Sequence, residues 1–220
     1  MTRRGPKPEK KVQTIWSPEL AYAVGLITSD GNLSNDRRHI DFTSKDLELI
    51  KTFKHCLGLK RIKIGTKTSG YTSKRYYRIQ FGDVNLYNWL LQIGLMPHKS
   101  KSLQALKIPD RYFFDFLRGY FDGDGTIYSY WDPRWKSSFM FYLQFASASR
   151  LYLQWLQLKL GELSNVHGRI QSGNRSYQLV FAKRESCILF KKMYHQKNSP
   201  KLKRKYLKMQ KILAIDLKNK

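Results

Sequence analysis

The chain has few acidic residues and few cysteines, and it lacks any long apolar run. Its 220 residues include 16 aspartates and glutamates against 41 lysines and arginines, which gives a formal net charge of +25. This excess of positive charge predicts a polyanionic partner, and its spread over the whole chain favours an extended surface for nucleic acid. No segment holds the roughly 20 consecutive apolar residues that cross a bilayer, so no membrane insertion is expected.

The only cysteines are Cys56 and Cys187, and neither has histidine or cysteine neighbours at the spacing of a zinc site. Both fall in amphipathic helical stretches, which indicates small core residues in a reducing compartment rather than a disulfide. Residues 1–11 are basic but lack the apolar core of a secretory signal. We therefore expect an intracellular protein, in the cytoplasm, nucleoid or organelle matrix, that is not secreted.

The chain does carry one short acidic motif in two copies. Residues 23–31 read AVGLITSDG and residues 117–125 read LRGYFDGDG, with Asp30 and Asp124 in matched positions, 124 − 30 = 94 residues apart. A lone Asp-Gly is usually a turn. Two copies, each after a glycine-bearing apolar segment and before strand-like runs, argue against turns alone and indicate an internal repeat.

The repeat extends beyond the motif, and each half predicts helix, strand, strand, helix, strand, strand, helix. After the motif, the further elements expected are helices over 46–58, 84–93, 149–161 and 184–195 and hairpins over 61–81 and 166–181. The helices over 46–58 and 149–161 are each expected to end at a Leu-Gly pair, because glycine adopts the left-handed cap cheaply. The predicted fold class is α+β, a pseudo-twofold repeat of αββαββα units with two antiparallel saddle-shaped sheets and helices on one face.

The expected domain organisation follows from this repeat. It comprises a basic arm over 1–16, a first repeat over 17–100, a linker over 101–108, a second repeat over 109–198 and a basic helix over 199–220. Ser17 and Pro18 mark the start of the first motif helix as cap and first-turn residue. The run from Arg3 to Lys7 is interpreted as a disordered basic tail, and a flexible arm that reaches a DNA groove is the alternative. The apolar stripe expected on the last helix comprises Leu202, Tyr206, Leu213 and Leu217.

Small residues recur at four-residue spacing in both motif helices. They are Ala21, Gly25 and Ser29 in the first and Gly119 and Gly123 in the second. A glycine inside a helix costs about 1 kcal/mol relative to alanine, so some packing must compensate. Two such small-residue faces let the helix backbones approach closely. We therefore predict that the two motif helices pair across a pseudo-twofold axis, with their terminal aspartates side by side.

Two carboxylates at two helix ends repel each other and the helix dipoles. Divalent cations offset this repulsion, and Mg²⁺ favours a few carboxylate or carbonyl ligands together with water and phosphate oxygens. Two such ions can clamp the attacking and leaving oxygens of a phosphodiester. A calcium-binding EF-hand starting at Asp122 is excluded, because Ile127 and Pro133 stand where that loop needs glycine and glutamate.

The two motifs and the segments around them, over about residues 17–205, resemble the LAGLIDADG homing endonucleases. The second motif matches closely, whereas the first has Thr28 where the pattern often has an acid. The resemblance implies a monomeric endonuclease that makes a staggered double-strand break across the minor groove of a long pseudo-palindromic DNA target. It also implies Mg²⁺ or Mn²⁺ as cofactor, with Ca²⁺ supporting binding without cleavage.

The resemblance also assigns site residues. It implies that Asp30 and Asp124 bind the metal and take part in catalysis, and that the backbone carbonyls of Ser29 and Gly123 contribute metal ligands. The segments 94–100 and 202–205 resemble those that carry supporting lysines in this family. Lys99 and Lys205 are therefore the expected catalytic lysines, and solvated surface lysines are the alternative.

The predicted hairpins alternate apolar and polar residues, which is typical of a sheet with one wet face. Their arginines and glutamines suit base edges in the major groove, while lysines at strand ends suit phosphates. An ordinary solvated face is the alternative, but the wet-face charges read as nearly all positive. The residues expected to bind DNA are Arg38, Arg61, Lys63, Lys67, Lys74, Arg75, Arg78, Gln80, His167, Arg169, Gln171 and Gln178.

Two other functions stay open on the residues alone. An RNA splicing maturase or a non-catalytic DNA-binding regulator would use the same scaffold without cutting. A ribosomal-type basic protein would lack metal-dependent activity altogether. Both motif aspartates are present, and a protein that only binds nucleic acid has no need of them, which favours the nuclease.

Overall fold

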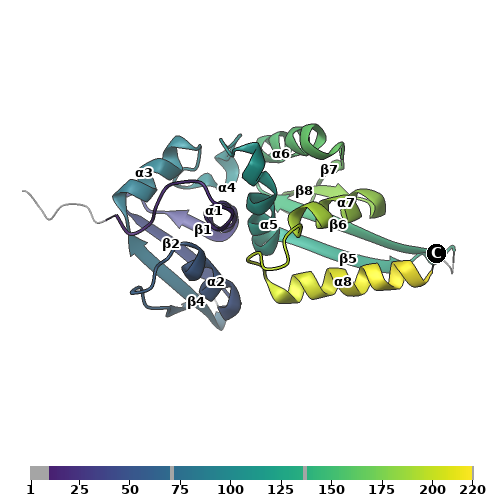
Figure 1. Ribbon diagram of the computed structural model, residues 1–220, viewed down its shortest axis with the longest axis horizontal. Helices are drawn as coiled ribbons and strands as arrows, with labels where there is room; N and C mark the ends of the chain where they lie inside the picture. Colours follow the sequence, from purple (N-terminus) through teal and green to yellow (C-terminus); the bar gives the residue numbers. More distant parts are fainter. Residues whose placement is uncertain (1–9, 70–71, 136–137, 220) are drawn as a thin grey trace, which may run out of the picture.

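The protein has an α+β fold with two similar halves, and the computed structural model describes residues 10–69, 72–135 and 138–219 (Figure 1). The first half comprises α1 (Pro18–Asp30), β1 (Gly31–Leu33), β2 (His39–Ser44), α2 (Leu47–Cys56), β3 (Gly65–Ser69), β4 (Thr72–Gly82) and α3 (Val84–Gln92). The second half comprises α5 (Phe113–Asp124), β5 (Gly125–Trp131), β6 (Phe139–Ser147), α6 (Arg150–Ser164), β7 (Arg169–Ser172), β8 (Tyr177–Phe181) and α7 (Lys183–Met193). The short helices α4 (Lys99–Ser102) and η1 (Asp110–Tyr112) link the halves, and α8 (Lys203–Lys218) ends the described chain.

Each half contains a four-stranded antiparallel sheet, and the strand order is the same in both. The orders are β1-β2-β4-β3 and β5-β6-β8-β7. In each sheet one face is apolar and buried, as shown by the alternating burial along β6, and α1 to α3 or α5 to α7 contact the sheet of their own half. The predicted α+β repeat of αββαββα units is confirmed.

The two motif helices pack against each other between the sheets (Figure 1). A Cβ atom added to Gly25 would lie 2.2 Å from the carbonyl oxygen of Phe116, and one added to Gly119 would lie 2.0 Å from that of Tyr22. Backbone therefore meets backbone at a distance that only glycine permits. The predicted pairing of the small-residue faces is confirmed.

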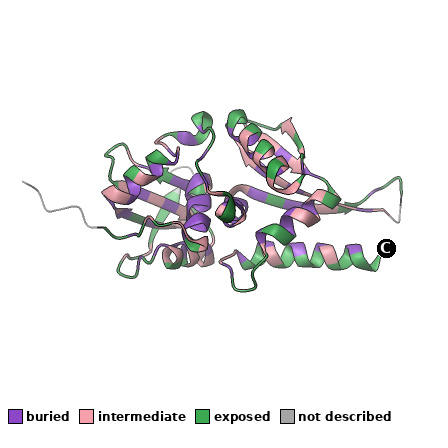
Figure 2. Cartoon of the chain, turned by 45° about the horizontal axis from the view of Figure 1, so that its top comes forward, coloured by how far each residue is buried: buried purple, intermediate pink, exposed green. Residues whose placement is uncertain are grey.

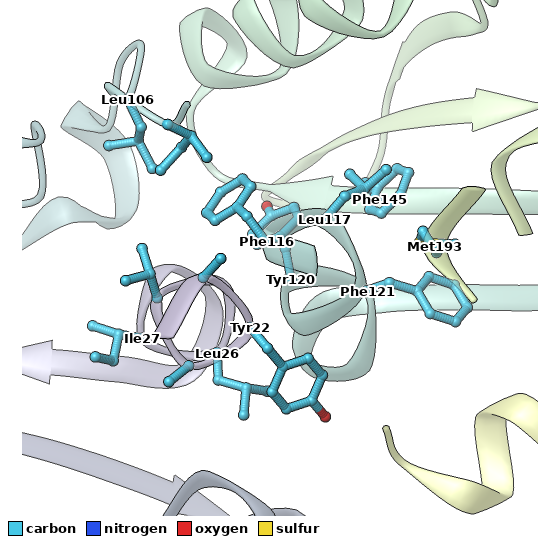
Figure 3. Packing of buried hydrophobic residues seen from close by; sticks show 14 of the residues in the cluster. Tyr22, Leu26, Ile27, Leu106, Phe116, Leu117, Tyr120, Phe121, Phe145 and Met193 are labelled. Atoms are coloured by element: carbon cyan, nitrogen blue, oxygen red, sulfur yellow. The ribbon is translucent and has the colours of Figure 1, made fainter. Parts of the chain in front are cut away.

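The core is continuous across this helix pair. Every residue from Leu20 to Thr28 is buried, and Figure 2 shows buried residues concentrated where the two halves meet. In the second half the packing is aromatic, with Tyr120 stacked on Phe145 at 6.0 Å between ring centroids (Figure 3). Since the residues at this interface are as deeply buried as those inside either half, the two halves share one hydrophobic core.

The helix caps follow the sequence only in part. Ser17 caps α1 as predicted, accepting the N–H of Leu20 at 3.1 Å, and Gly58 adopts a left-handed φ of 64° after α2. The prediction that α6 ends at Gly161 is wrong. The helix continues to Ser164 and ends on Asn165, which takes the left-handed conformation with φ 51°. Asparagine tolerates that conformation better than most residues, so it replaces glycine as the cap.

The stripe predicted for the last helix is also partly wrong. Leu202 is buried, but Leu217 is 71% exposed, and the buried face of α8 instead includes Met209 and Ile212. An ion pair between Asp216 and Lys183 ties this face to α7, which fixes the rotation of α8. The side of α8 that bears Leu217 therefore faces solvent.

The segment that precedes α1 is held by the first half. The backbone N–H groups of Lys11 and Val12 donate to Asp83 Oδ2 at 2.8 and 3.0 Å, and Asp83 also caps α3. The predicted arm from Arg3 to Lys7 lies outside the described residues. Cys56 and Cys187 are half-buried and pack beside the core. None of the described helices combines the length and apolarity needed for a bilayer crossing.

Candidate active site

The helix pair brings Asp30 and Asp124 to one place, because they are the last residues of α1 and α5. A Cβ atom added to Gly123 would lie 1.9 Å from Ser29 Oγ and 3.3 Å from Asp30 Oδ2. The Asp30 carboxylate therefore lies against the residue that directly precedes Asp124. Two acids 124 − 30 = 94 positions apart in the chain thus share a site.

The surroundings of the two carboxyls disfavour their charged forms. Loss of hydration, followed by the negative charge of Asp30, raises the pKa of Asp124 to about 6, although Lys205 and Lys99 oppose this shift. Loss of hydration likewise raises the pKa of Asp30. Asp30 keeps an exposed surface and Asp124 is half-buried, so both remain reachable from solvent. Repulsion between two accessible carboxylates is the condition that a bound cation relieves.

Lys205 reaches the same site from the start of α8. Its Nζ donates to the carbonyl oxygens of Phe121, Gly123 and Gly125 at 2.6, 3.0 and 2.6 Å. A helix leaves its last carbonyls without partners, and a cation there also offsets the helix dipole. Burial lowers the pKa of Lys205 to about 8.

Lys99 occupies the corresponding place beside the first motif. Its Nζ donates to the carbonyl oxygen of Gly31, directly after Asp30. Burial lowers its pKa to about 8, while Asp124 and Asp30 act to raise it. Only 7% of Lys99 and 8% of Lys205 is exposed, so neither is the solvated surface lysine of the alternative interpretation. All four residues predicted to be catalytic therefore lie together.

A cavity of about 210 Å³ opens beside Asp124, and its lining includes Ser29, Lys99 and Tyr120. In the described part of the chain no three histidine, cysteine, aspartate or glutamate side chains cluster as a protein-only metal cage. The site instead offers two carboxylates and open space, while the carbonyl of Gly123, expected to be a metal ligand, accepts a hydrogen bond from Lys205 Nζ at 3.0 Å. Hard oxygen donors with room for water or phosphate fit Mg²⁺, Mn²⁺ or Ca²⁺ better than softer metals.

Removing one carboxylate should stabilise the metal-free protein at neutral pH. The pKa of Asp124 is about 6 in the folded state, against an ordinary value of 3.8. The contribution of this carboxyl group to the stability of the folded protein is therefore fully present below pH 4 and is lost as the pH rises through 6. In buffer with EDTA at pH 7.5, Asp124→Asn should gain about 1 kcal/mol after allowance for partial exposure. We expect a melting temperature about 2–4 °C higher at pH 7.5 and equal at pH 4. A lower melting temperature than wild type at pH 7.5 would contradict this.

Comparison with known protein families identifies the family to which the chain belongs. The profile of the LAGLIDADG-like domain family matches residues 17–94 and 113–194, one span in each half and together more than half of the chain. The chain belongs to the LAGLIDADG family. An uncharacterized protein of Methanocaldococcus jannaschii is 27% identical over 118 residues, which cover 51% of this LAGLIDADG chain and 41% of that relative. The chain thus spans less than half the length of that relative.

Solved structures share the fold. The homing endonuclease I-WcaI, bound to its DNA recognition sequence, superposes with a TM-score of 0.62 at 15% identity, over 94% of this chain and 95% of that one. Full-length DUF199/WhiA from Thermatoga maritima superposes with a TM-score of 0.61 at 16% identity, over 94% of this chain and 63% of that one. I-DmoI in complex with DNA and Ca superposes with a TM-score of 0.58 at 17% identity, over 88% of this chain and 97% of that one. Divalent metal is therefore present in a structural neighbour.

The open face of the first sheet of this LAGLIDADG protein carries Lys67, Arg78 and Gln80. Register places Gln80 opposite Asp41, and Lys67 opposite Tyr76, two residues from Arg78. Arg78 forms an ion pair with Asp41, so its charge is already matched in the free protein. Gln80 is exposed and is free to meet a ligand.

The other residues predicted from this half lie in different places. By alternation along β4, Arg75 falls on the side of the buried Ile79, whereas Lys74 lies in the register shift between the Thr68–Arg75 and Ser69–Thr72 pairs. Arg38 is exposed in the turn before β2. Only part of the predicted set therefore lies on one surface.

The predicted strand over 61–64 is wrong. Strand β3 begins only at Gly65, and Arg61 and Lys63 lie in the exposed connection from α2. The N–H of Ile62 bonds to the carbonyl of the buried Leu59 at 3.3 Å, which turns the chain before it can extend. Alternation of basic and apolar residues in this segment reflects a turn over the core edge rather than a sheet face.

In the second half, Arg169, Gln171 and Gln178 do share the open face. The side chain of Arg169 donates to Gln171 at 3.3 Å, and Gln171 donates to Gln178 at 3.2 Å. His167 does not share this face with them. Gly168, with φ 54°, turns the chain before β7, and the His167 ring lies near Gly161 of α6 instead.

The open face of the second sheet is aromatic and nearly uncharged over its described strands. Tyr142 stacks on Tyr128 at 5.3 Å and on Tyr130 at 6.1 Å between ring centroids. Gln144 lies beside them, opposite Thr126. Arg169 supplies the one charge on this face over those strands, so the charge has the expected sign, but the face is polar and aromatic rather than basic.

Sequence reasoning missed the buried polar stripe of α5 formed by Asp115, Arg118 and Asp122. Arg118 is fully buried and pairs with Asp115 at 2.7 Å. Burial raises the pKa of Asp122 to about 6, although hydrogen bonds from Tyr22 and Leu202 oppose the shift. The available signal was the spacing of these three charged residues at i, i+3 and i+7, which puts them on one face of α5.

Proposed function

We propose that this LAGLIDADG protein is a sequence-specific, metal-dependent DNA endonuclease that acts as a monomer on a long, imperfectly palindromic duplex. One observation carries the proposal. Asp30 and Asp124 end paired helices at one accessible site, with the buried Lys99 and Lys205 beside them. Two carboxylates next to a phosphate backbone cost binding energy, and a protein that only bound DNA would gain by losing them.

The residues divide the chemistry between them. Asp30 and Asp124 would hold divalent ions, which when bound neutralise the scissile phosphate and acidify a bound water. Lys99 and Lys205 have pKa values lowered to about 8, and an approaching phosphate favours their protonated forms. Their positive charge then stabilises the charge that develops on the phosphoryl group in the transition state. Mg²⁺ or Mn²⁺ would support cleavage and Ca²⁺ binding alone.

Selection from a randomised duplex library tests the proposal without knowledge of the target. With Mg²⁺, cleaved molecules should share one long, imperfectly palindromic sequence, and with Ca²⁺ the same sequence should be retained uncut. Recovery of a bound duplex that neither Mg²⁺ nor Mn²⁺ allows to be cut would favour a binding protein instead.

A second candidate function is a maturase or regulator that binds nucleic acid without cutting it. One observation favours it. Exposed lysines on α8, including Lys203, Lys208 and Lys211, add positive charge on a helix that packs beside α7. Competition between the selected duplex and intron RNA would separate the two functions. Tight RNA binding that the duplex does not displace would support a maturase role.

The two sheet faces should contribute differently to DNA binding. Lys67→Gln on the first sheet removes one phosphate contact, so affinity should fall for every sequence and the slope of log K against log salt should shrink by about 1. Gln178→Ala on the second sheet should leave that slope unchanged and relax preference at one base position. Fluorescence anisotropy over a salt series measures both effects. Equal slopes for wild type and Lys67→Gln would show that Lys67 makes no phosphate contact.

A further inference from the structure

A buried hydrogen-bond network lies behind the active site, centred on Asp122. Its Oδ2 accepts the hydroxyl of Tyr22 at 2.7 Å and the backbone N–H of Leu202 at 2.8 Å. Tyr22 projects from α1 beside α5 (Figure 3). One carboxyl group therefore joins the first motif helix, the second motif helix and the start of α8.

This contact fixes the residue from which α8 begins. Leu202 is the cap of the helix, and its carbonyl accepts the N–H of Lys205 at 3.1 Å and that of Tyr206 at 3.2 Å. Holding Leu202 thus holds the first turn, which places Lys205 Nζ against the last carbonyls of α5. A shift of Leu202 would move the amine relative to Asp124.

Arg118 holds the rest of the connection between α7 and α8. Its Nη1 donates to the carbonyl of Met193 at 2.5 Å and its Nε to that of Pro200 at 2.8 Å. Asp115 balances its charge at 2.7 Å. Both ends of the segment from 193 to 202 are therefore anchored on polar groups of α5, and a polar group buried this deeply is costly unless it is paired.

Over its described residues, the first half shows no counterpart of this network. With the 94-residue offset of the repeat, Asp122 corresponds to Thr28 and Arg118 to Val24. The Thr28 hydroxyl donates to the carbonyl of Val24 in its own helix at 2.8 Å. Lys99 is placed instead by the short helix α4. The two lysines at the site are thus held in different ways.

We propose that Asp122, oriented by Tyr22, is a positioning residue that sets Lys205 for cleavage of one DNA strand. The inference rests on the proposed endonuclease function. Asp122→Leu removes the acceptor that holds Leu202, whereas Asp122→Asn keeps an oxygen that accepts the same N–H. Loss of the anchor should therefore impair the strand that depends on Lys205, while the strand that depends on Lys99 should be cut normally.

The test measures cleavage of the two strands separately, on the duplex recovered by library selection with a different fluorophore on each strand. Lys205→Met identifies the strand that depends on Lys205. Asp122→Leu should change the ratio of the two strand rates in the same direction, by about tenfold or more. Asp122→Asn should restore the wild-type ratio, and Tyr22→Phe should change it by about threefold. Thr28→Val, the matched variant of the first half, should leave it unchanged.

If Asp122→Leu only lowers the general stability of the protein, cleavage of both strands slows equally and the ratio of the two rates stays as in wild type. That result would overturn the proposal. An unchanged ratio in Lys205→Met would do the same. If Asp122→Leu does not fold, an unchanged ratio of the two strand rates in Tyr22→Phe decides against the proposal. If the wild type cuts neither strand, the endonuclease proposal fails, and hydrogen exchange then decides on the anchor. Amides over 202–206 should exchange faster in Asp122→Leu or Tyr22→Phe than in Thr28→Val, and equal rates would overturn the positioning role.

Discussion

Asp124→Asn should abolish double-strand cleavage and leave duplex binding intact. The amide keeps the shape of the carboxylate but loses the charge that holds a divalent ion, and such ions contribute several kcal/mol to phosphoryl transfer. We therefore expect linear product from a plasmid carrying the selected site to form about 10³-fold more slowly. Binding in EDTA should be equal or tighter, because one negative charge leaves the DNA surface. Asp30→Asn should behave in the same way.

The matched control is Asp110→Asn, which removes an acid of equal size from the protein surface. Asp110 lies in η1, its side chain is 60% exposed, and it pairs with Lys159 rather than with the active site. This variant should linearise the plasmid at the wild-type rate. Full linearisation by either motif variant would show that the two aspartates do not perform the reaction.

The topology could be predicted because it is encoded locally and encoded twice. Caps such as Ser17, the alternation in β4 and β8, and the repeated motif each restrict one element, and the repeat requires both halves to agree. The pairing of the motif helices followed from glycines that only close packing explains. Once the helices pair, the meeting of Asp30 and Asp124 follows without further information.

The remaining features depend on contacts between distant residues, which a local pattern does not carry. Arg78 looks like a base-reading arginine in β4, but its partner Asp41 comes from β2. Gly161 looks like a helix end, but α6 continues past it to a different cap. Lys205 looks like one lysine of a basic tail, and only the fold shows that it caps α5. The sequence does not tell a charged side chain at the surface from one that is buried or paired, and only the tertiary packing distinguishes the two.

Gly119→Ala should destabilise the protein by about 3 kcal/mol or more. The new Cβ would lie 2.0 Å from the carbonyl oxygen of Tyr22 and 3.1 Å from its Cα, and neither backbone atom can turn aside as a side chain does. Helices α1 and α5 must separate, and well-packed interiors do not absorb such a shift. Urea denaturation should show a lower midpoint with an unchanged m-value.

Gly65→Ala is the matched control, since it makes the same substitution in β3. There the nearest atom to the new Cβ would be the carbonyl oxygen of Arg78 at 3.9 Å, which is ordinary contact. Its stability should stay within about 0.5 kcal/mol of wild type. If Gly119→Ala were equally stable, the close backbone contact between the motif helices would be wrong.

Gly119→Ala should also lose activity at temperatures where it stays folded. The same helix pair that Gly119 closes carries Asp30 and Asp124 at its ends, so a separation of α1 and α5 also separates the two acids. A displacement of about 1 Å is enough to reduce such a reaction about 10²-fold. Cleavage measured at 20 °C, with folding checked by circular dichroism, should therefore fall well below that of Gly65→Ala. The glycines of the motif then serve the chemistry through packing, since they set the distance between the carboxylates.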